Sequence, residues 1–217
     1  MKIICIARNY GDHAAEMGAP QYRRGSTEAL APAFFLKPES ALLTDDRPFH
    51  YPDFSRQVEH EVEVVVRICK DGKNILQEHV RDYYDAVTVG IDFTARDLQR
   101  QAKAKGLPWT LSKGFDESAP VGRFVSLQEM GNDVSNMSFR LLKNGQAVQQ
   151  GNTGEMLCSV DGMISYVSRY ISLSTGDLIF TGTPSGVGPV EVGDRLVAEL
   201  DSFIRPKQSH LMMYTVK

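Results

Sequence analysis

The chain has 217 residues, of which 42% are apolar and 24% charged, and its 24 basic and 27 acidic residues leave a formal net charge of −3. This composition is typical of a globular protein and excludes a disordered or collagen-like chain. The near-neutral charge argues against a nucleic-acid-binding protein, which usually carries a basic face. Because a chain this long can bury one good core, we expect residues 1–217 to form a single domain.

Signals for membranes and export are weak in this sequence. No apolar run approaches the roughly 18 residues that cross a bilayer, so we expect no membrane partner. The apolar run at residues 3–7 is shorter than the core of a secretory signal peptide and predicts a first strand instead. The three cysteines form no C-x-x-C pair, which argues against a disulfide framework or a thiolate zinc site and favours the cytoplasm.

In chain order, the predicted strands outnumber the predicted helices. Extended segments are expected at 2–7, 33–43, 61–68, 88–92 and in a hairpin over 138–150, with strand and turn after residue 172. Helices are expected at 13–17, 78–86, 94–105 and 161–172. Asp12 and a capping box from Thr94 to Asp97 are the expected helix starts, and Asn144-Gly145 is a type I′ turn signal. We therefore predict an α+β, mainly β fold with short helices.

The segment from Glu59 to Val66 carries the most chemical information. Because side chains alternate along a strand, Glu59, Glu61 and Glu63 are expected on one face and the intervening valines on the other. Neighbouring carboxylates repel unless a positive charge lies between them, and a hard cation such as Mg²⁺ suits an all-oxygen site. A solvated acidic strand face is the commoner alternative for an isolated Glu-x-Glu.

Asp92 is the candidate third ligand, because it ends a predicted buried strand just before a helix. On that helix Arg96 and Gln99 lie three residues apart and share a face, where they could bind a substrate carboxylate. Lys113 follows the helix and could stabilise an oxyanion or an enolate near a cation. The commoner alternatives are that Asp92 caps the helix and that Arg96, Gln99 and Lys113 are exposed to solvent.

Two further segments are candidates for a role at the same site. His13 and Glu16 lie three residues apart on a short predicted helix, so Glu16 could orient His13 as a general base. The turn at 181–188 combines threonine hydroxyls with glycine amides that could hold a carboxylate. The alternative for His13 and Glu16 is a pair of exposed side chains, and the alternative for 181–188 is an ordinary tight turn.

These pieces, in this order, resemble the fumarylacetoacetate hydrolase family over about residues 3–200. The matching segments are 8–10 with His13 and Glu16, 35–38, 60–63, 92–99, 106–113, 151–153, and 176–177 leading to 181–188. Residues 17–32 look longer and more basic than in many relatives, and the tail after Leu200 does not match. The compact chain looks most like the stand-alone acylpyruvate hydrolases, some of which also act on oxaloacetate.

The resemblance implies a mixed β-roll or β-sandwich and a homodimer. It implies Mg²⁺ (with Mn²⁺ or Ca²⁺ as alternatives) bound by Glu61, Glu63 and Asp92. It further implies a substrate site lined by Arg96, Gln99, Lys113 and Thr183, and a mobile lid over residues 8–32 that carries His13 and Glu16.

The expected activity is hydrolysis of an acylpyruvate such as acetylpyruvate or fumarylpyruvate to pyruvate and a carboxylic acid. In this interpretation His13, oriented by Glu16, activates a water, and Lys113 stabilises the oxyanion. The alternatives that use the same residues are decarboxylation or tautomerisation of oxaloacetate and isomerisation of 2-hydroxyhepta-2,4-diene-1,7-dioate. A β-domain that only binds metal or carboxylate is the alternative that is not an enzyme.

Overall fold

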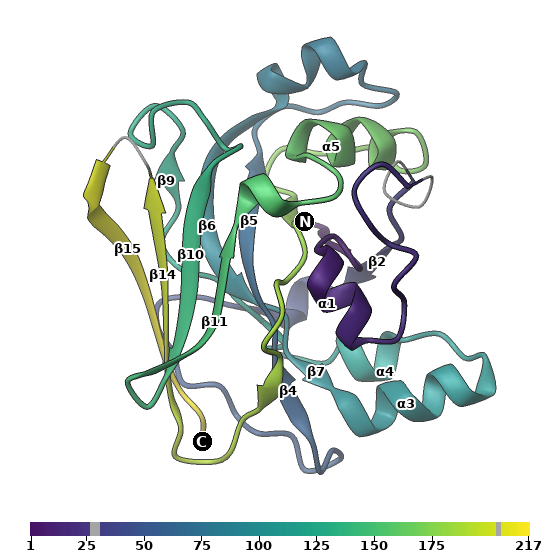
Figure 1. Ribbon diagram of the computed structural model, residues 1–217, viewed down its shortest axis with the longest axis vertical. Helices are drawn as coiled ribbons and strands as arrows, with labels where there is room; N and C mark the ends of the chain where they lie inside the picture. Colours follow the sequence, from purple (N-terminus) through teal and green to yellow (C-terminus); the bar gives the residue numbers. More distant parts are fainter. Residues whose placement is uncertain (27–30, 203–204) are drawn as a thin grey trace.

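Two β-sheets form the body of the molecule in the computed structural model, which describes residues 1–26, 31–202 and 205–217 (Figure 1). The larger sheet has six strands, all antiparallel except for the parallel pair β1–β12. In spatial order they are β2 (Phe34–Lys37), β1 (Ile3–Ile6), β12 (Leu178–Phe180), β5 (Val62–Ile68), β6 (Tyr84–Ile91) and β9 (Val125–Ser126).

The second sheet has four antiparallel strands, in the order β11 (Gln146–Asn152), β10 (Met137–Lys143), β14 (Arg195–Ser202) and β15 (Arg205–Thr215). Asn144 and Gly145 join β10 to β11 with φ values of 52° and 82°. Positive φ at both central residues is the requirement of a type I′ turn, so the predicted hairpin is confirmed.

The hydrophobic core lies between the two sheets. Strand β10 packs against β5, and β14 and β15 pack against β6. Val62, Val64 and Val66 of β5 join this core, whereas Val65 packs on the other face of the sheet with Phe180 and others. Because β5 is covered on both faces, polar groups at its ends are removed from water. The predicted mainly β fold, a mixed roll or sandwich, is confirmed.

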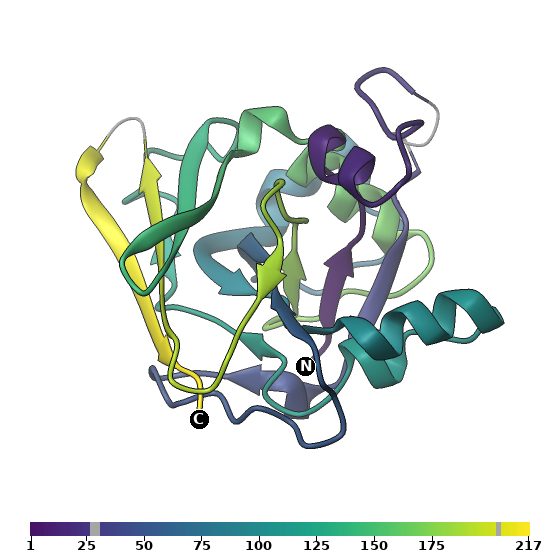
Figure 2. The same ribbon diagram turned by 60° about the horizontal axis from the view of Figure 1, so that its bottom comes forward.

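Short helices flank the sheets (Figure 2). They are α1 (Gly11–Glu16), α3 (Arg96–Lys105), α4 (Thr110–Lys113), α5 (Val160–Ser168) and the 3-10 helices η1 (Glu39–Ala41), η2 (Gln77–Tyr83) and η3 (Thr153–Glu155). The remaining strands are β3 (Leu42–Leu43), β4 (Val58–His60), β7 (Thr94–Ala95), β8 (Ala119–Pro120) and β13 (Gly188–Pro189). Within the described ranges, no helix is long and apolar enough to span a bilayer.

Three local expectations are wrong. The segment predicted as a helix over 78–86 is a 3-10 helix only to Tyr83, because Tyr84 onward pairs with β5. No side chain caps α1 or α3, so Asp12 is not a cap and the capping box is absent. The Thr94 hydroxyl instead donates to Glu61 Oε1 at 3.1 Å. Tertiary pairing and the polar site have overridden these local signals.

Candidate metal centre and active site

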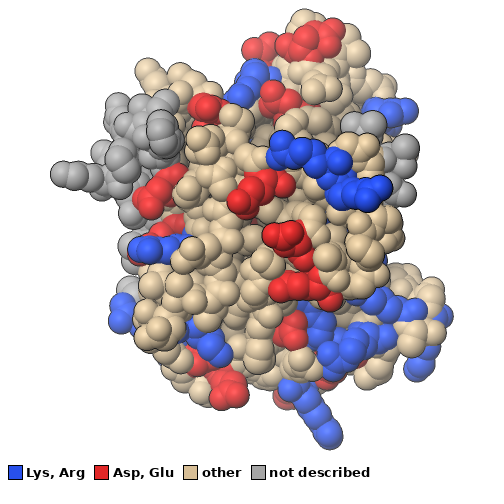
Figure 3. All heavy atoms as spheres, in the orientation of Figure 1, with Lys and Arg blue, Asp and Glu red and all other residues tan. Residues whose placement is uncertain are grey.

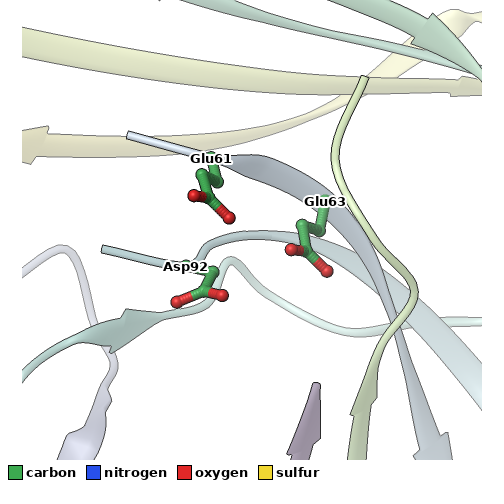
Figure 4. Close-up of side chains that lie close together, drawn as sticks. All are labelled: Glu61, Glu63 and Asp92. Carbon is green, nitrogen blue, oxygen red and sulfur yellow. The ribbon is translucent and has the colours of Figure 1, made fainter. Parts of the chain in front are cut away.

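Three carboxylates meet at one end of the larger sheet: Glu61 just before β5, Glu63 within β5, and Asp92 just after the paired strand β6 (Figure 4). Strand β5 pairs with β6 so that Val62 lies opposite Ile91, and the Asp92 N–H donates to the Glu61 carbonyl at 2.8 Å. This register places Asp92 beside Glu61 and Glu63, with one oxygen of each within 4.8 Å of the others. In the described ranges, this is the one cluster of at least three acidic, His or Cys side chains with such spacing.

Two buried lysines lie against the cluster. Lys113 Nζ is 2.9 Å from Glu61 Oε2 and 2.6 Å from Asp92 Oδ2, while Lys37 Nζ is 2.8 Å from Asp92 Oδ1. Lys37 directs its hydrogen bonds to the Phe93 carbonyl and to both oxygens of Ser118. Asp92 Oδ1 therefore has a positive neighbour but no hydrogen bond, although it is buried.

Arg96 on α3 forms hydrogen bonds with three polar side chains at the cluster. Its Nη2 donates to Glu61 Oε1 at 2.5 Å, its Nε to Glu59 Oε2 at 2.6 Å and its Nη1 to Gln99 Oε1 at 2.7 Å. Arg96 and Gln99 thus face the site as predicted. Glu59 lies apart from the three-carboxylate cluster, because it pairs with this guanidinium.

Glu61 and Glu63 have opposite pKa shifts. Burial, together with the charges of Asp92 and Glu61, raises the pKa of Glu63 well above its ordinary value. Burial also acts to raise the pKa of Glu61, but Lys113 and Arg96 outweigh it and hold that pKa low. The hydrogen bond to Glu63 comes from the Gly182 N–H at 2.6 Å, and no ion pair reaches Glu63 in the part of the chain described.

This donor set fits a divalent cation. When all groups are ionised, four carboxylates face three cations, Lys37, Arg96 and Lys113. In the described part of the chain Glu63 forms no ion pair and Asp92 Oδ1 no hydrogen bond, so both have oxygen lone pairs to share. Carboxylate oxygens are the ligands that Mg²⁺ and Mn²⁺ prefer.

His13 on α1 lies over the cluster and is 7% exposed. Its Nδ1 is 3.6 Å from Glu16 Oε2, too far for a hydrogen bond, and no other described residue bonds to it. Glu16 Oε1 accepts from the Gly186 N–H at 3.2 Å. Burial lowers the pKa of His13 despite the nearby Glu61 carboxylate, so the imidazole is neutral near neutral pH.

Thr183 is buried beside the cluster, but its hydroxyl is already engaged. It donates to the Val62 carbonyl at 2.8 Å and accepts from Gln149 Nε2 at 2.9 Å. No role at the site was expected for Gln149 or Lys37, although Lys37 lies in the matching segment 35–38. A lysine inside the apolar run before Pro38 was an available signal for Lys37, whereas Gln149 lies in an ordinary hairpin and gave none.

A cavity of about 40 Å³ opens on the cluster. It is lined by eight of the nine predicted site residues: His13, Glu61, Glu63, Asp92, Arg96, Gln99, Lys113 and Thr183. Glu16 is the exception. A wider depression of about 610 Å³ lies beside α5, but none of the nine residues lines it. Residues 27–30 of the predicted lid lie outside the described residues.

Known proteins share this fold and much of this sequence. The family model described as fumarylacetoacetate (FAA) hydrolase C-terminal matches residues 2–208. The mitochondrial oxaloacetate tautomerase FAHD1 of Mus musculus is 41% identical over 202 residues, or 93% of this chain and 88% of that protein. The mitochondrial oxaloacetate decarboxylase of Dictyostelium discoideum is 42% identical over 193 residues, or 88% of this chain and 85% of that protein.

A similar solved structure is that of fumarylpyruvate hydrolase from Pseudomonas aeruginosa in complex with Mn²⁺ and pyruvate. It is 32% identical, has a TM-score of 0.89, and the match covers 100% of this chain and 89% of that chain. The family model spans nearly the whole sequence, and the relatives are matched over most of their length. The chain therefore belongs to the fumarylacetoacetate hydrolase family of enzymes.

Proposed function

We propose that this protein is a divalent-metal-dependent tautomerase of oxaloacetate. The observation that carries the proposal is the cluster of Glu61, Glu63 and Asp92 at a small cavity that Lys113 and Arg96 also line. Such a site suits a small 2-oxo acid, and the relatives from mouse and Dictyostelium are both named for oxaloacetate. This replaces acylpyruvate hydrolysis, the activity first expected, as the main interpretation.

Each residue has a defined task in this proposal. Glu61, Glu63 and Asp92 would hold the metal, which when bound would polarise the 2-oxo group as a Lewis acid. The charges of Asp92 and Glu61 outweigh burial and raise the pKa of Lys113, so its ammonium can stabilise negative charge on the 2-oxygen. Neutral His13, whose Nδ1 has no hydrogen-bond partner among the described residues, takes a proton from C3 while the 2-oxygen gains one from solvent. In the reverse direction His13 returns its proton to C3 as the 2-hydroxyl loses its own to solvent.

The test follows the enol form of oxaloacetate. Protein stripped by a chelator and then resupplied with Mn²⁺ is mixed with enol oxaloacetate, and the loss of enol absorbance is recorded while pyruvate is assayed with lactate dehydrogenase. We expect metal-dependent enol loss without pyruvate. Pyruvate formed at the same rate would assign decarboxylation instead, and an unchanged rate of both would contradict the proposal.

Hydrolysis of an acylpyruvate is a second candidate, favoured by one specific observation. Glu16 Oε2 lies 3.6 Å from His13 Nδ1, and Glu16 Oε1 accepts from the Gly186 N–H. A carboxylate at that distance would stabilise the imidazolium that forms when His13 takes a proton from water. The neighbour with bound Mn²⁺ and pyruvate is named fumarylpyruvate hydrolase. Comparison of kcat/KM for oxaloacetate, acetylpyruvate and fumarylpyruvate decides between the two candidates.

A further inference from the structure

Two cations line the active-site cavity without taking part in the carboxylate cluster. They are Arg8, just after β1, and Lys103, on α3. Lys37, Arg96 and Lys113 are all paired with carboxylates. Arg8 and Lys103 form no ion pair with any acidic side chain among residues 1–26, 31–202 and 205–217, and basic side chains gather over α3 in Figure 3.

Arg8 is held in an unfavourable backbone conformation. Its φ of 59° lies in the left-handed region, which costs a residue other than glycine on the order of 1 kcal/mol. Its guanidinium donates to the Tyr22 hydroxyl at 3.3 Å, and its Cζ is 5.0 Å from the centre of the Tyr22 ring. Among the residues that the structure describes, no acidic side chain pairs with Arg8, so its contacts with Tyr22 hold a planar donor at the cavity.

Lys103, on α3, lines the same cavity. Its Nζ lies 5.5 Å from the centre of the Trp109 ring, and Trp109 also lines the cavity. Arg8, Arg96 and Lys103 all line this cavity, and burial together with the charges of Arg96 and Arg8 lowers the pKa of Lys103. Arg96 is already paired with Glu59 and Glu61, whereas Arg8 and Lys103 have no acidic partner among the described residues. An anion that binds between Arg8 and Lys103 therefore relieves their repulsion.

We propose that Arg8 and Lys103 bind the distal carboxylate of the substrate and make the enzyme selective for 2-oxo dicarboxylates over 2-oxo acids with an uncharged end. The placement of the other end of the substrate at the carboxylate cluster rests on the proposed function. An arginine fork and an ammonium together match a carboxylate. Aromatic contacts keep both side chains in place before the ligand arrives.

The experiment compares two unreactive probes that differ at one group. (S)-Malate and (S)-2-hydroxybutyrate share the carboxylate and the 2-oxygen, but the distal carboxylate of malate is a methyl group in hydroxybutyrate. Their dissociation constants for the Mn²⁺-loaded protein are measured by calorimetry. We expect malate to bind at least about 10-fold more tightly, and Lys103→Met and Arg8→Asn each to weaken malate about 10-fold. Hydroxybutyrate affinity should stay within about twofold.

Lys105→Met is the matched control, because it removes one exposed charge from the same helix and does not line the cavity. It should leave malate affinity unchanged. Equal affinity of the unaltered protein for both probes, or an equal loss of both in the variants, would overturn the proposal. Because malate does not react, selectivity can be present in a protein that fails to tautomerise oxaloacetate, and then only the proposed function is lost.

Discussion

Glu61 lies just before β5 and Glu63 two residues later within it, yet their surroundings give them different ionisation. Lys113 and Arg96 hold the pKa of Glu61 low, whereas burial beside Asp92 and Glu61 raises the pKa of Glu63. A carboxylate without a counter-charge destabilises the fold when it ionises. Glu63 therefore connects the stability of this protein to the presence of a cation.

We predict that Glu63→Gln stabilises the metal-free protein. Because the folded-state pKa of Glu63 is raised, its contribution is full below its ordinary pKa of 4.5 and is lost as the pH rises through the folded-state value. The variant should thus match the unaltered protein near pH 4 and exceed it by at least about 1 kcal/mol at pH 8. Urea unfolding in the presence of a chelator measures this difference.

Once metal is present, Glu63→Gln should be less stable than the unaltered protein. A ligand at 100 times its dissociation constant adds about 2.7 kcal/mol to the folded state that binds it, and the glutamine amide is a poorer metal ligand. Saturating Mn²⁺ should therefore stabilise the unaltered protein more than Glu63→Gln. If the variant and the unaltered protein unfold at the same urea concentration both with chelator and with Mn²⁺, Glu63 does not connect stability to the cation.

Residue types and spacing predicted which side chains converge, because strand alternation and helix periodicity fix the faces of Glu61, Glu63, Arg96 and Gln99. The roles of these residues stay predictions. The sequence did not predict which ion pairs these side chains form. Nothing local shows that Arg96 divides its donors between Glu59 and Glu61, since those contacts depend on how β4 docks against α3.

At the scale of elements, one side chain joins the hairpin to the site. Gln149 of β11 accepts from His60 Nδ1 at 2.9 Å and from the Val62 N–H at 3.0 Å. Its amide donates to Thr183 Oγ1 at 2.9 Å and to the Pro184 carbonyl at 3.1 Å. This glutamine holds the 183–184 turn against β5 from within the core.

We predict that Gln149→Met lowers the free energy of unfolding by about 2–4 kcal/mol, because it leaves several buried polar groups without partners. Gln150→Met is the matched control, since the neighbouring side chain is exposed and should tolerate the change within about 0.5 kcal/mol. Urea unfolding of both variants tests the prediction. If Gln149→Met and Gln150→Met lower the free energy of unfolding equally, the amide network does not stabilise the turn.

Elements with strong local signals were predicted well, and those set by distant partners were not. The Asn144-Gly145 turn carries its own signal, and the structure has it. Residues 84–86 continue a helical pattern but pair with β5, and Thr94 bonds to Glu61 in place of its own helix. In both segments, contacts with residues distant in the sequence determined the observed structure.

At the scale of the whole molecule, two packed sheets bring remote segments to one end of β5. The parallel pairing of Ile3 with Leu178 joins the first strand to the far end of the chain and positions the segment that carries Arg8 and His13. A mainly β architecture follows from the sequence, but this pairing across most of the chain length has no local signal. The predicted homodimer and the movement of residues 8–32 stay predictions.

The measurement that tests this account most directly is a calorimetric titration of chelator-stripped protein with Mn²⁺. We predict one ion per chain, binding at least about 100-fold weaker in Glu63→Gln, and unchanged affinity in the control Glu59→Gln, which alters a carboxylate that pairs with Arg96 instead. Stripped protein that takes up no Mn²⁺, or a Glu63→Gln variant that binds it as tightly as the unaltered chain, would contradict the claim that Glu61, Glu63 and Asp92 share one cation.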